Sequence, residues 1–299
     1  YLMVGGDKYN HSMYLAAQKT YRVYVPLEFW FCRNVGLALP LIALQYHEVK
    51  INIDFETRAN LIDAGANYSN RGFSRRLGDN TEGTTALLNS ALTTANQANL
   101  KLQEVSLWVD YIFLDTDERR RFAQLSHEYL IEQLQFTGSD TISSANTTRS
   151  IRMNFNHPCK ELVWYVKPDV DTGKTTYWNN FSDRTGDNNI WLGNNPVVSA
   201  KIQLNGNDRF AERIGTYFSL VQPYQHHDNT PNAFHTGINV YSFAIKPEEH
   251  QPSGTLNMSR IDTAVLSVSS SKTGSIYIYT TNYNVLRILS RMGGLAYSN

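Results

Sequence analysis

The sequence has little cysteine, no excess of charge of either sign and no long uninterrupted apolar run. Its two cysteines, Cys32 and Cys159, cannot build the disulfide framework of a small secreted scaffold, so we expect two reduced thiols. Lys+Arg and Asp+Glu number 27 each, and no net charge therefore attracts the chain to nucleic acid or to an anionic membrane. Direct binding of nucleic acid is not expected.

The sequence also lacks the common motifs of enzymes. It contains no G-x-S-x-G, no P-loop, no G-x-G-x-x-G and no H-E-x-x-H. The adjacent His226 and His227 would point to opposite faces of a strand, and no zinc-type spacing of ligands links them to His235. We interpret this region as a solvated loop. The sequence predicts no catalytic residue, no cofactor and no metal ligand.

The most apolar stretch runs from Val23 to Tyr46, and it does not fit a membrane helix. Glu28 and Arg33 interrupt the run, and Pro26 and Pro40 would break a helix. The pieces that remain are rich in aromatic and branched residues, which is typical of buried strands. We therefore expect core strands with a turn at Arg33–Gly36, and the strand pieces are Val23–Val25, Phe29–Phe31 and Leu37–Leu44.

Apolar residues alternate with polar ones along five further segments, a pattern typical of strands with one buried face. The segments are Val49–Phe55, Val105–Phe113, Ile151–Phe155, Ile202–Leu204 and Ile276–Ile278. Long polar loops are expected at 58–99 and 169–195, and only short helices are expected, near Asp115 and at 208–215 and 257–263. This balance predicts an all-β sandwich or barrel.

A group of charges marks the middle of the chain. Asp115 and Glu118 have the spacing of a capping box at the start of a helix. The group consists of Asp115, Asp117, Glu118, Arg119, Arg120 and Arg121. We interpret these residues as intramolecular or intersubunit ion pairs rather than as an acid–base pair. The composition changes over Arg121–Gly138, which predicts a domain boundary there.

Four Asn-x-Ser/Thr sequons occur, at Asn67, Asn146, Asn180 and Asn257. The first three lie in expected loops. They are turn-forming residues by default, and they are candidate glycosylation sites if suitable machinery acts on them.

Seven blocks of sequence, in order, carry a resemblance to a known family. They are YVPLEFWF, GLALPLIALQYHEVKI, LWVDYIFLDTDERRRFAQLSHEYLIEQLQFTG, MNFNHPCKELVW, AKIQLNGNDRF, QPSGTLNMSRIDTA and NYNVLRILSRMGGLAYSN. Together they closely resemble the major capsid proteins of nucleocytoplasmic large DNA viruses, the group of the chlorella viruses and iridoviruses. The resemblance implies a tandem double jelly roll, in which residues 1–121 are the later part of the first sandwich and 122–299 a complete second one.

The resemblance further implies a non-enzymatic protein of the virion capsid, assembled in the host cytoplasm. Three copies would form a pseudo-hexagonal capsomer that contacts neighbouring capsomers and minor capsid and penton proteins. The shell would overlie an internal membrane that the chain itself does not span. A partial first sandwich leaves a core face exposed, so we expect a longer protein or another segment to supply the missing strands. The alternative is a carbohydrate-binding jelly-roll protein, which would have convergent polar residues in a pocket.

Overall fold

The computed structural model describes residues 22–55, 63–65, 74–76, 102–169, 181–183, 194–228 and 237–297. The chain divides into two compact units. One consists of residues 1–27, 49–118 and 173–179, and the other of residues 28–48, 119–172 and 180–299. Most of the described strands belong to the second unit.

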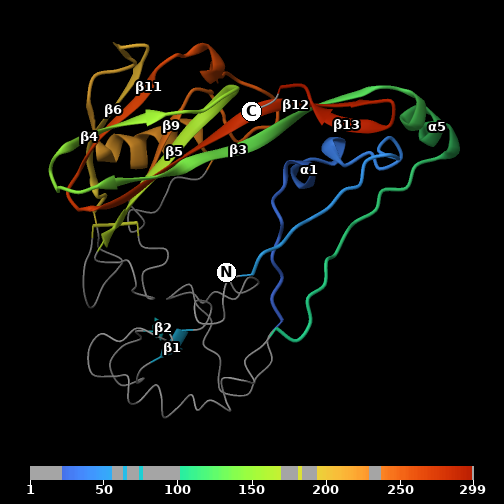
Figure 1. Ribbon diagram of the computed structural model, residues 1–299, viewed down its shortest axis with the longest axis horizontal. Coiled ribbons are helices and arrows are strands. Elements are labelled where there is room, and N and C mark those ends of the chain that lie inside the picture. The colour runs from blue at the N-terminus through green and yellow to red at the C-terminus, as the bar shows by residue number, and fades with distance from the viewer. Residues whose placement is uncertain are drawn as a thin grey trace. The chain divides into compact units, whose positions relative to one another are not determined.

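Two antiparallel sheets form the second unit (Figure 1). One sheet has the order β3 (His127–Ile142), β12 (Gly274–Leu289), β5 (Pro158–Pro168), followed on the far side of β5 by β9 (Ile238–Ser242) and β10 (Leu256–Asn257). The other has the order β4 (Thr148–Met153), β11 (Ala264–Ser270), β6 (Val197–Leu204), followed by β7 (Asn207–Asp208) and β8 (Arg213–Ile214). This is a jelly-roll arrangement of four positions in each sheet, and it confirms the all-β prediction.

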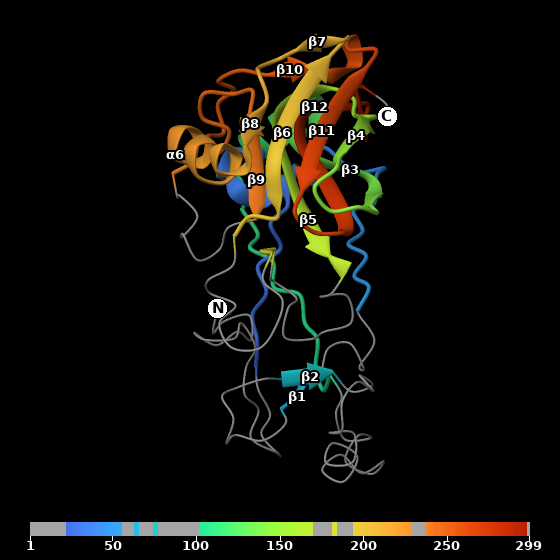
Figure 2. The same ribbon diagram turned by 90° about the vertical axis from the view of Figure 1, so that its left-hand side faces the viewer.

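The core lies between the two sheets, which Figure 2 shows as separate layers with β6 and β11 in one and β5 and β12 in the other. On β5, Leu162, Trp164 and Val166 alternate with less buried neighbours and have no exposed surface. They belong to one cluster with Ile202 of β6 and Leu266 of β11. Each such side chain contributes about 1.5–3 kcal/mol through burial. Alternation was predicted from the sequence at Ile151–Phe155, Ile202–Leu204 and Ile276–Ile278, and the structure confirms it there, because Ile151, Ile202 and Ile276 all belong to this cluster.

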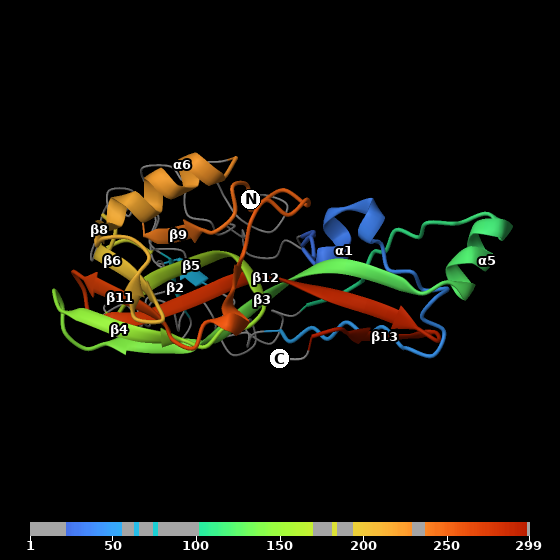
Figure 3. The ribbon, with the colours of Figure 1, turned by 90° about the horizontal axis from the view of Figure 1, so that it is seen from above.

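One sheet continues beyond the sandwich. Figure 3 shows β3 and β12 running on past β5 towards β13 (Met292–Leu295), and β13 pairs with the end of β12 from Leu286 to Leu289. The turn between β12 and β13 consists of Ser290 and Arg291, both with positive φ (51° and 66°). Two consecutive left-handed residues give the twist that a two-residue hairpin needs. Asn205 and Gly206 form the corresponding turn between β6 and β7.

The short helices agree only in part with the sequence-based prediction. The helix α5 (Thr116–Gln124) is present where it was expected. The helix predicted at 208–215 is wrong, because this segment contributes β7 and β8 to the edge of β6. The helical residues come later, as the π-helical turn η7 (Tyr217–Val221) and α6 (Gln222–His226). A 3₁₀ turn, η8 (Met258–Arg260), lies within the range expected at 257–263.

The apolar stretch 23–46 does not form the expected strands. It contains instead a single helical turn, α1 (Trp30–Arg33), and a 3₁₀ turn, η2 (Val35–Leu37). The Asn34 side chain accepts a hydrogen bond from Gly36 N at 2.8 Å, which accounts for the turn near the expected position. Ala43 and Leu44 are buried against Ile288, beside the extension of β3 and β12. Ala43 and Leu44 are thus buried by packing on an existing sheet rather than by pairing into one, whereas Val25, Val35 and Tyr46 of the same stretch are exposed.

The first unit has few described strands. Among its described residues these are β1 (Asp63–Gly65) and β2 (Ser74–Arg76), which pair with each other. Segments 49–55 and 105–113, predicted as strands, pair with no strand among the residues that the structure describes, and Trp108 and Phe113 are 83% and 89% exposed. The prediction of paired strands is therefore wrong for these segments. Alternation shows which side chains would share a face, but burial requires a second layer of structure. The expectation that further strands complete this sandwich stays a prediction.

Candidate functional site

A β-bulge places two charged side chains side by side on the outer face of the second unit. Thr281 of β12 pairs with Glu161 of β5, whereas the next residue, Asn282, pairs with Cys159, so Lys160 is the extra residue. Because of the bulge, Lys160 and Glu161 both lie on the face that is opposite Leu162 and the core. Lys160 is nevertheless only 2% exposed, so its charge must be compensated within the protein.

Two groups compensate the Lys160 ammonium. Its Nζ donates to Glu132 Oε1 of β3 at 2.6 Å and to the carbonyl oxygen of Pro247 at 2.7 Å, and lies 5.2 Å from the centre of the Tyr283 ring. The second oxygen of Glu132 accepts from Arg33 Nη1 of α1 at 3.0 Å. Burial, together with the charge of Glu132, raises the pKa of Tyr283 to about 12. These contacts hold α1, β3, β5 and the loop after β9 together.

His227 extends this set of charges just after α6. Its Nδ1 lies 2.7 Å from Glu248 Oε1, in the loop after β9, and its Nε2 lies 3.2 Å from Glu161 Oε2. The contact with Glu161 raises the pKa of His227, burial opposes the shift, and Glu248 adds to it. The side chain is 13% exposed, so the expectation of a solvated loop is wrong for this residue. We call Arg33, Glu132, Lys160, Glu161, His227 and Glu248 the charge network.

The charge network is suited to a structural role, because its side chains pair with one another and connect several elements. Each ring nitrogen of His227 faces a carboxylate, so neither is directed towards a shared ligand site. Throughout the parts of the chain that the structure describes, no three His, Cys, Asp or Glu side chains are arranged to hold a metal ion. In the same parts, no helix combines the length and apolar character needed to cross a bilayer.

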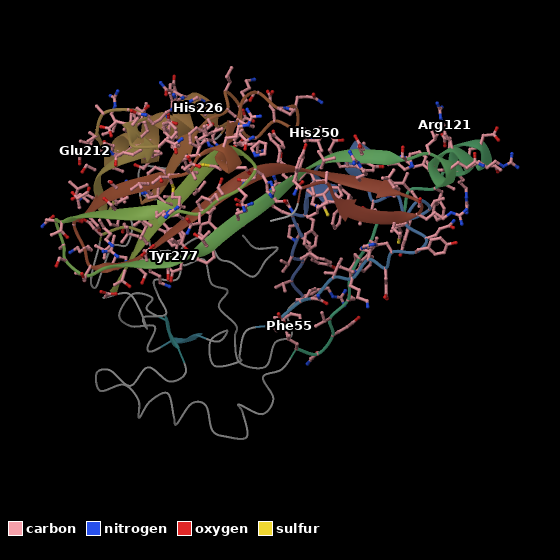
Figure 4. The ribbon with its side chains drawn as sticks, turned by 45° about the horizontal axis from the view of Figure 1, so that its top comes forward. Phe55, Arg121, Glu212, His226, His250 and Tyr277 are labelled. Carbon is pink, nitrogen blue, oxygen red and sulfur yellow. The ribbon has the colours of Figure 1, made fainter. Side chains whose placement is uncertain are left out.

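A row of aromatic rings lies further along the same outer face. Tyr165 of β5 stacks on Tyr277 at 5.1 Å between ring centres, and Tyr279 stacks on Phe136 of β3 at 4.6 Å. Tyr277 is labelled in Figure 4. Burial and the neighbouring Tyr279 raise the pKa of Tyr165 above its ordinary value. Beside this row Leu134 is 70% exposed. This part of the sheet therefore combines stacked aromatic rings with an exposed apolar side chain.

The charged group predicted from the sequence lies at the start of α5, and its members from Asp115 to Arg121 are exposed. Asp115 N donates to Glu118 Oε2 at 3.2 Å, and Thr116 N donates to Asp115 Oδ1 at 2.6 Å. The predicted capping contact of Glu118 is thereby confirmed. A role of Asp117, Arg119, Arg120 and Arg121 in contacts between subunits or domains stays a prediction.

Of the candidate glycosylation sites, the structure describes Asn146. It is exposed, has a φ of 59° and lies in the connection between β3 and β4, so it is a turn residue as expected. Asn67 and Asn180 lie outside the described residues. Asn257 instead caps η8, because its side chain accepts from Ser259 N at 3.1 Å.

Comparison with known proteins identifies the family. The family described as "Large eukaryotic DNA virus major capsid protein" matches residues 118–294, and "Major capsid protein N-terminus" matches residues 6–115. The major capsid protein of Pyramimonas orientalis virus is 47% identical over 100% of this chain and 67% of its own length. That of Paramecium bursaria Chlorella virus 1 is 43% identical over 98% of this chain and 72% of its own length. The chain spans about two thirds of the length of the curated relatives that it matches.

A solved structure supports the same family. The quasi-atomic model of the PBCV-1 virus capsid matches with a TM-score of 0.66 and 36% identity, over 98% of this chain and 74% of that one. These relatives are capsid proteins, a structural class, in agreement with the non-enzymatic role predicted from the sequence. The chain therefore belongs to the major capsid protein family of large eukaryotic DNA viruses.

Proposed function

We propose that this chain is a structural subunit of an icosahedral viral shell, and that three copies form a pseudo-hexagonal capsomer. The observation that carries the proposal is the jelly-roll unit, within a chain that matches the PBCV-1 capsid structure over 98% of its length. Closed cyclic assembly multiplies modest contacts into a stable shell. A three-fold interface is heterologous, so each subunit must offer two different surfaces.

The proposal extends to the organisation of the subunit. Residues 1–121 would belong to the first sandwich and 122–299 to the second, with the exposed charges of Asp115–Arg121 at contacts between subunits or domains. The aromatic row at Phe136 and Tyr277 would provide a second contact surface, since stacked rings and exposed apolar residues are typical of interfaces. Neighbouring capsomers, minor capsid proteins and penton proteins would be the partners. The shell would assemble in the host cytoplasm over an internal membrane.

Surface loops would carry any glycans. Asn146 supports this part of the proposal, because it is an exposed sequon residue in a tight connection between strands. Asn67 and Asn180 are the other candidates. Intact-mass analysis of protein from virions, compared with the Asn146→Gln variant, would detect a sugar on this residue as a mass above that of the bare chain.

The test of assembly is the mass of the full chain in solution, measured by light scattering after size exclusion. Three chains of 34.0 kDa give about 102 kDa, and a particle of this mass that resists dilution is the expected result. A monomer that binds a sugar column would overturn the proposal in favour of a carbohydrate-binding role. Arg119→Glu should weaken the trimer if α5 lies in the interface, and Arg209→Glu, which changes another exposed arginine, is the matched control.

A further inference from the structure

With both neighbouring carboxylates ionised, the geometry around His227 favours the charged form of its ring. A neutral imidazole carries one N–H donor and one lone pair. Here both ring nitrogens face carboxylate oxygens, from Glu248 at 2.7 Å and from Glu161 at 3.2 Å. In either neutral tautomer one carboxylate would face a lone pair, and the two would repel each other. The imidazolium has a donor for each carboxylate.

Two buried atoms at the contact between His227 and Glu161 also favour the charged ring. Glu161 Oε2 and His227 Nε2 are both buried, and neither has an aligned hydrogen bond within the described parts of the chain. Two such atoms at an ion-pair distance are costly unless a charge attracts them to each other. The proton on Nε2 supplies this attraction.

The carboxylate of Glu248 connects the ring to one loop, which runs from the end of β9 to β10. The start of this loop is fixed by the backbone, since Phe243 N and Ala244 N both donate to the carbonyl oxygen of Lys160. Its next part depends on side chains. Pro247 O accepts from Lys160, and the two oxygens of Glu248 contact His227 and Asp228 N. Removing the charge on His227 would therefore loosen residues 245–249 while their anchor stays in place.

We propose that His227 is a proton-dependent latch that holds the loop at residues 245–249 against the outer face of the sandwich. This inference goes beyond the capsid role and does not depend on it. The groups that face the ring are Glu161 from β5 and Glu248 from the loop. Nearby charges are Lys160 with Glu132, Asp228 next in sequence, and the exposed pair of Lys246 with Glu249. A second titratable group, His226 of α6, contacts the same loop, since its Nδ1 lies 2.9 Å from the carbonyl oxygen of Ile245.

The direction of the pH dependence follows from the raised pKa of His227. Because the carboxylates raise the pKa of His227 above its ordinary value of about 6.5, the folded protein binds the proton more tightly than the unfolded chain does. The latch is fully closed below about pH 6.5 and opens as the pH rises through the raised value. Loss of one proton changes the opening equilibrium by up to about tenfold per pH unit.

Hydrogen exchange of the full chain tests the latch. After correction for the intrinsic rate, three amides should be up to about tenfold better protected at about pH 6 than one unit above the raised pKa. They are the amide of Asp228, which donates to Glu248 Oε2, and the amides of Ile245 and Lys246, which donate to Ser253. His227→Gln should remove the difference and show the weaker protection at every pH. His250→Gln is the matched control, because His250 is exposed in the same loop, as labelled in Figure 4. It should behave as the unmodified protein does.

Two further measurements separate the latch from a folding defect. In the unmodified protein, the ring of His227 should titrate above about pH 6.5 in NMR spectra of histidine-labelled protein. In Glu248→Gln the loop should lose protection, while the contact with Glu161 still keeps the ring pKa raised. The proposal is overturned if the ring titrates at or below the ordinary value. It is also overturned if His227→Gln keeps the pH dependence of loop exchange.

Discussion

Replacing Lys160 by methionine tests whether the charge network is a main source of stability in the sandwich. Methionine has a similar length but no charge, so the change removes the bonds to Glu132 Oε1 and to the Pro247 carbonyl. Of its two ion-pair partners among the described residues, Glu132 then keeps Arg33 and becomes an undercompensated, largely buried carboxylate. Breaking a buried pair from one side costs about 3–5 kcal/mol. We expect a loss of free energy of unfolding in this range.

Urea unfolding followed by tryptophan fluorescence is the assay, because Trp164 is fully buried in the core of the same unit. With a slope of about 2 kcal/mol per molar urea, the midpoint should fall by about 1.5–2.5 M. Lys246→Met is the matched control. Its partner is Glu249, the two side chains are 60% and 52% exposed, and such pairs contribute at most about 1 kcal/mol. Equal shifts for the two variants would refute the reasoning.

A double variant isolates the cause of the loss. Lys160→Met combined with Glu132→Leu removes both buried charges and leaves Arg33, whose side chain is 57% exposed, in contact with water. It should be more stable than Lys160→Met alone, because replacing a whole buried pair by apolar groups is often close to neutral. If the double variant is the less stable of the two, packing rather than charge explains the effect of Lys160.

Two further predictions concern backbone packing and thiol chemistry. Gly215→Ala should destabilise the sandwich by more than about 3 kcal/mol, because the new Cβ would lie 1.8 Å from the Val197 carbonyl oxygen. Gly294→Ala, with open space at that position, should change stability by less than about 1 kcal/mol in the same urea assay. Iodoacetamide at about pH 8 should modify the exposed Cys32 and spare Cys159, because burial raises the pKa of that thiol to about 12. Peptide mass mapping would detect each adduct, and rapid modification of Cys159 in the folded protein would contradict its burial.

Local patterns were sufficient to predict much of the second unit. The apolar residues of the predicted segments Ile151–Phe155 and Ile276–Ile278 alternate and are buried, and a period of two indicates a buried face without knowledge of the neighbouring strands. The same rule failed for 105–113, because alternation does not show whether a partner strand is present. The helix prediction at 208–215 was wrong because here a partner strand is present and the local pattern does not show it. The free edge of β6 offered those residues hydrogen bonds that local propensity does not include.

The charge network could not be predicted because its members are far apart in the sequence. Arg33 and Glu132 are separated by 99 residues, and the bulge that turns Lys160 outwards interrupts the alternation of β5. One local signal was present, since the consecutive charges Lys160 and Glu161 stand within the apolar run PCKELVWYV. Two charges inside a strand that is otherwise buried require partners. The sequence alone does not show that these partners come from β3, the residue after α6 and the loop after β9.

The pairing of β3 with β12 has a mechanical consequence. It runs from Gly274 opposite Ile142 to Ile288 opposite His127, along nearly the whole length of both strands. Hydrogen bonds in an antiparallel ladder are perpendicular to the strands. A force along β12 therefore loads many of these bonds in shear at the same time, whereas a force across the strands would break them one after another. In a shell, stress directed along this strand pair would be shared by the whole ladder before either strand could slide.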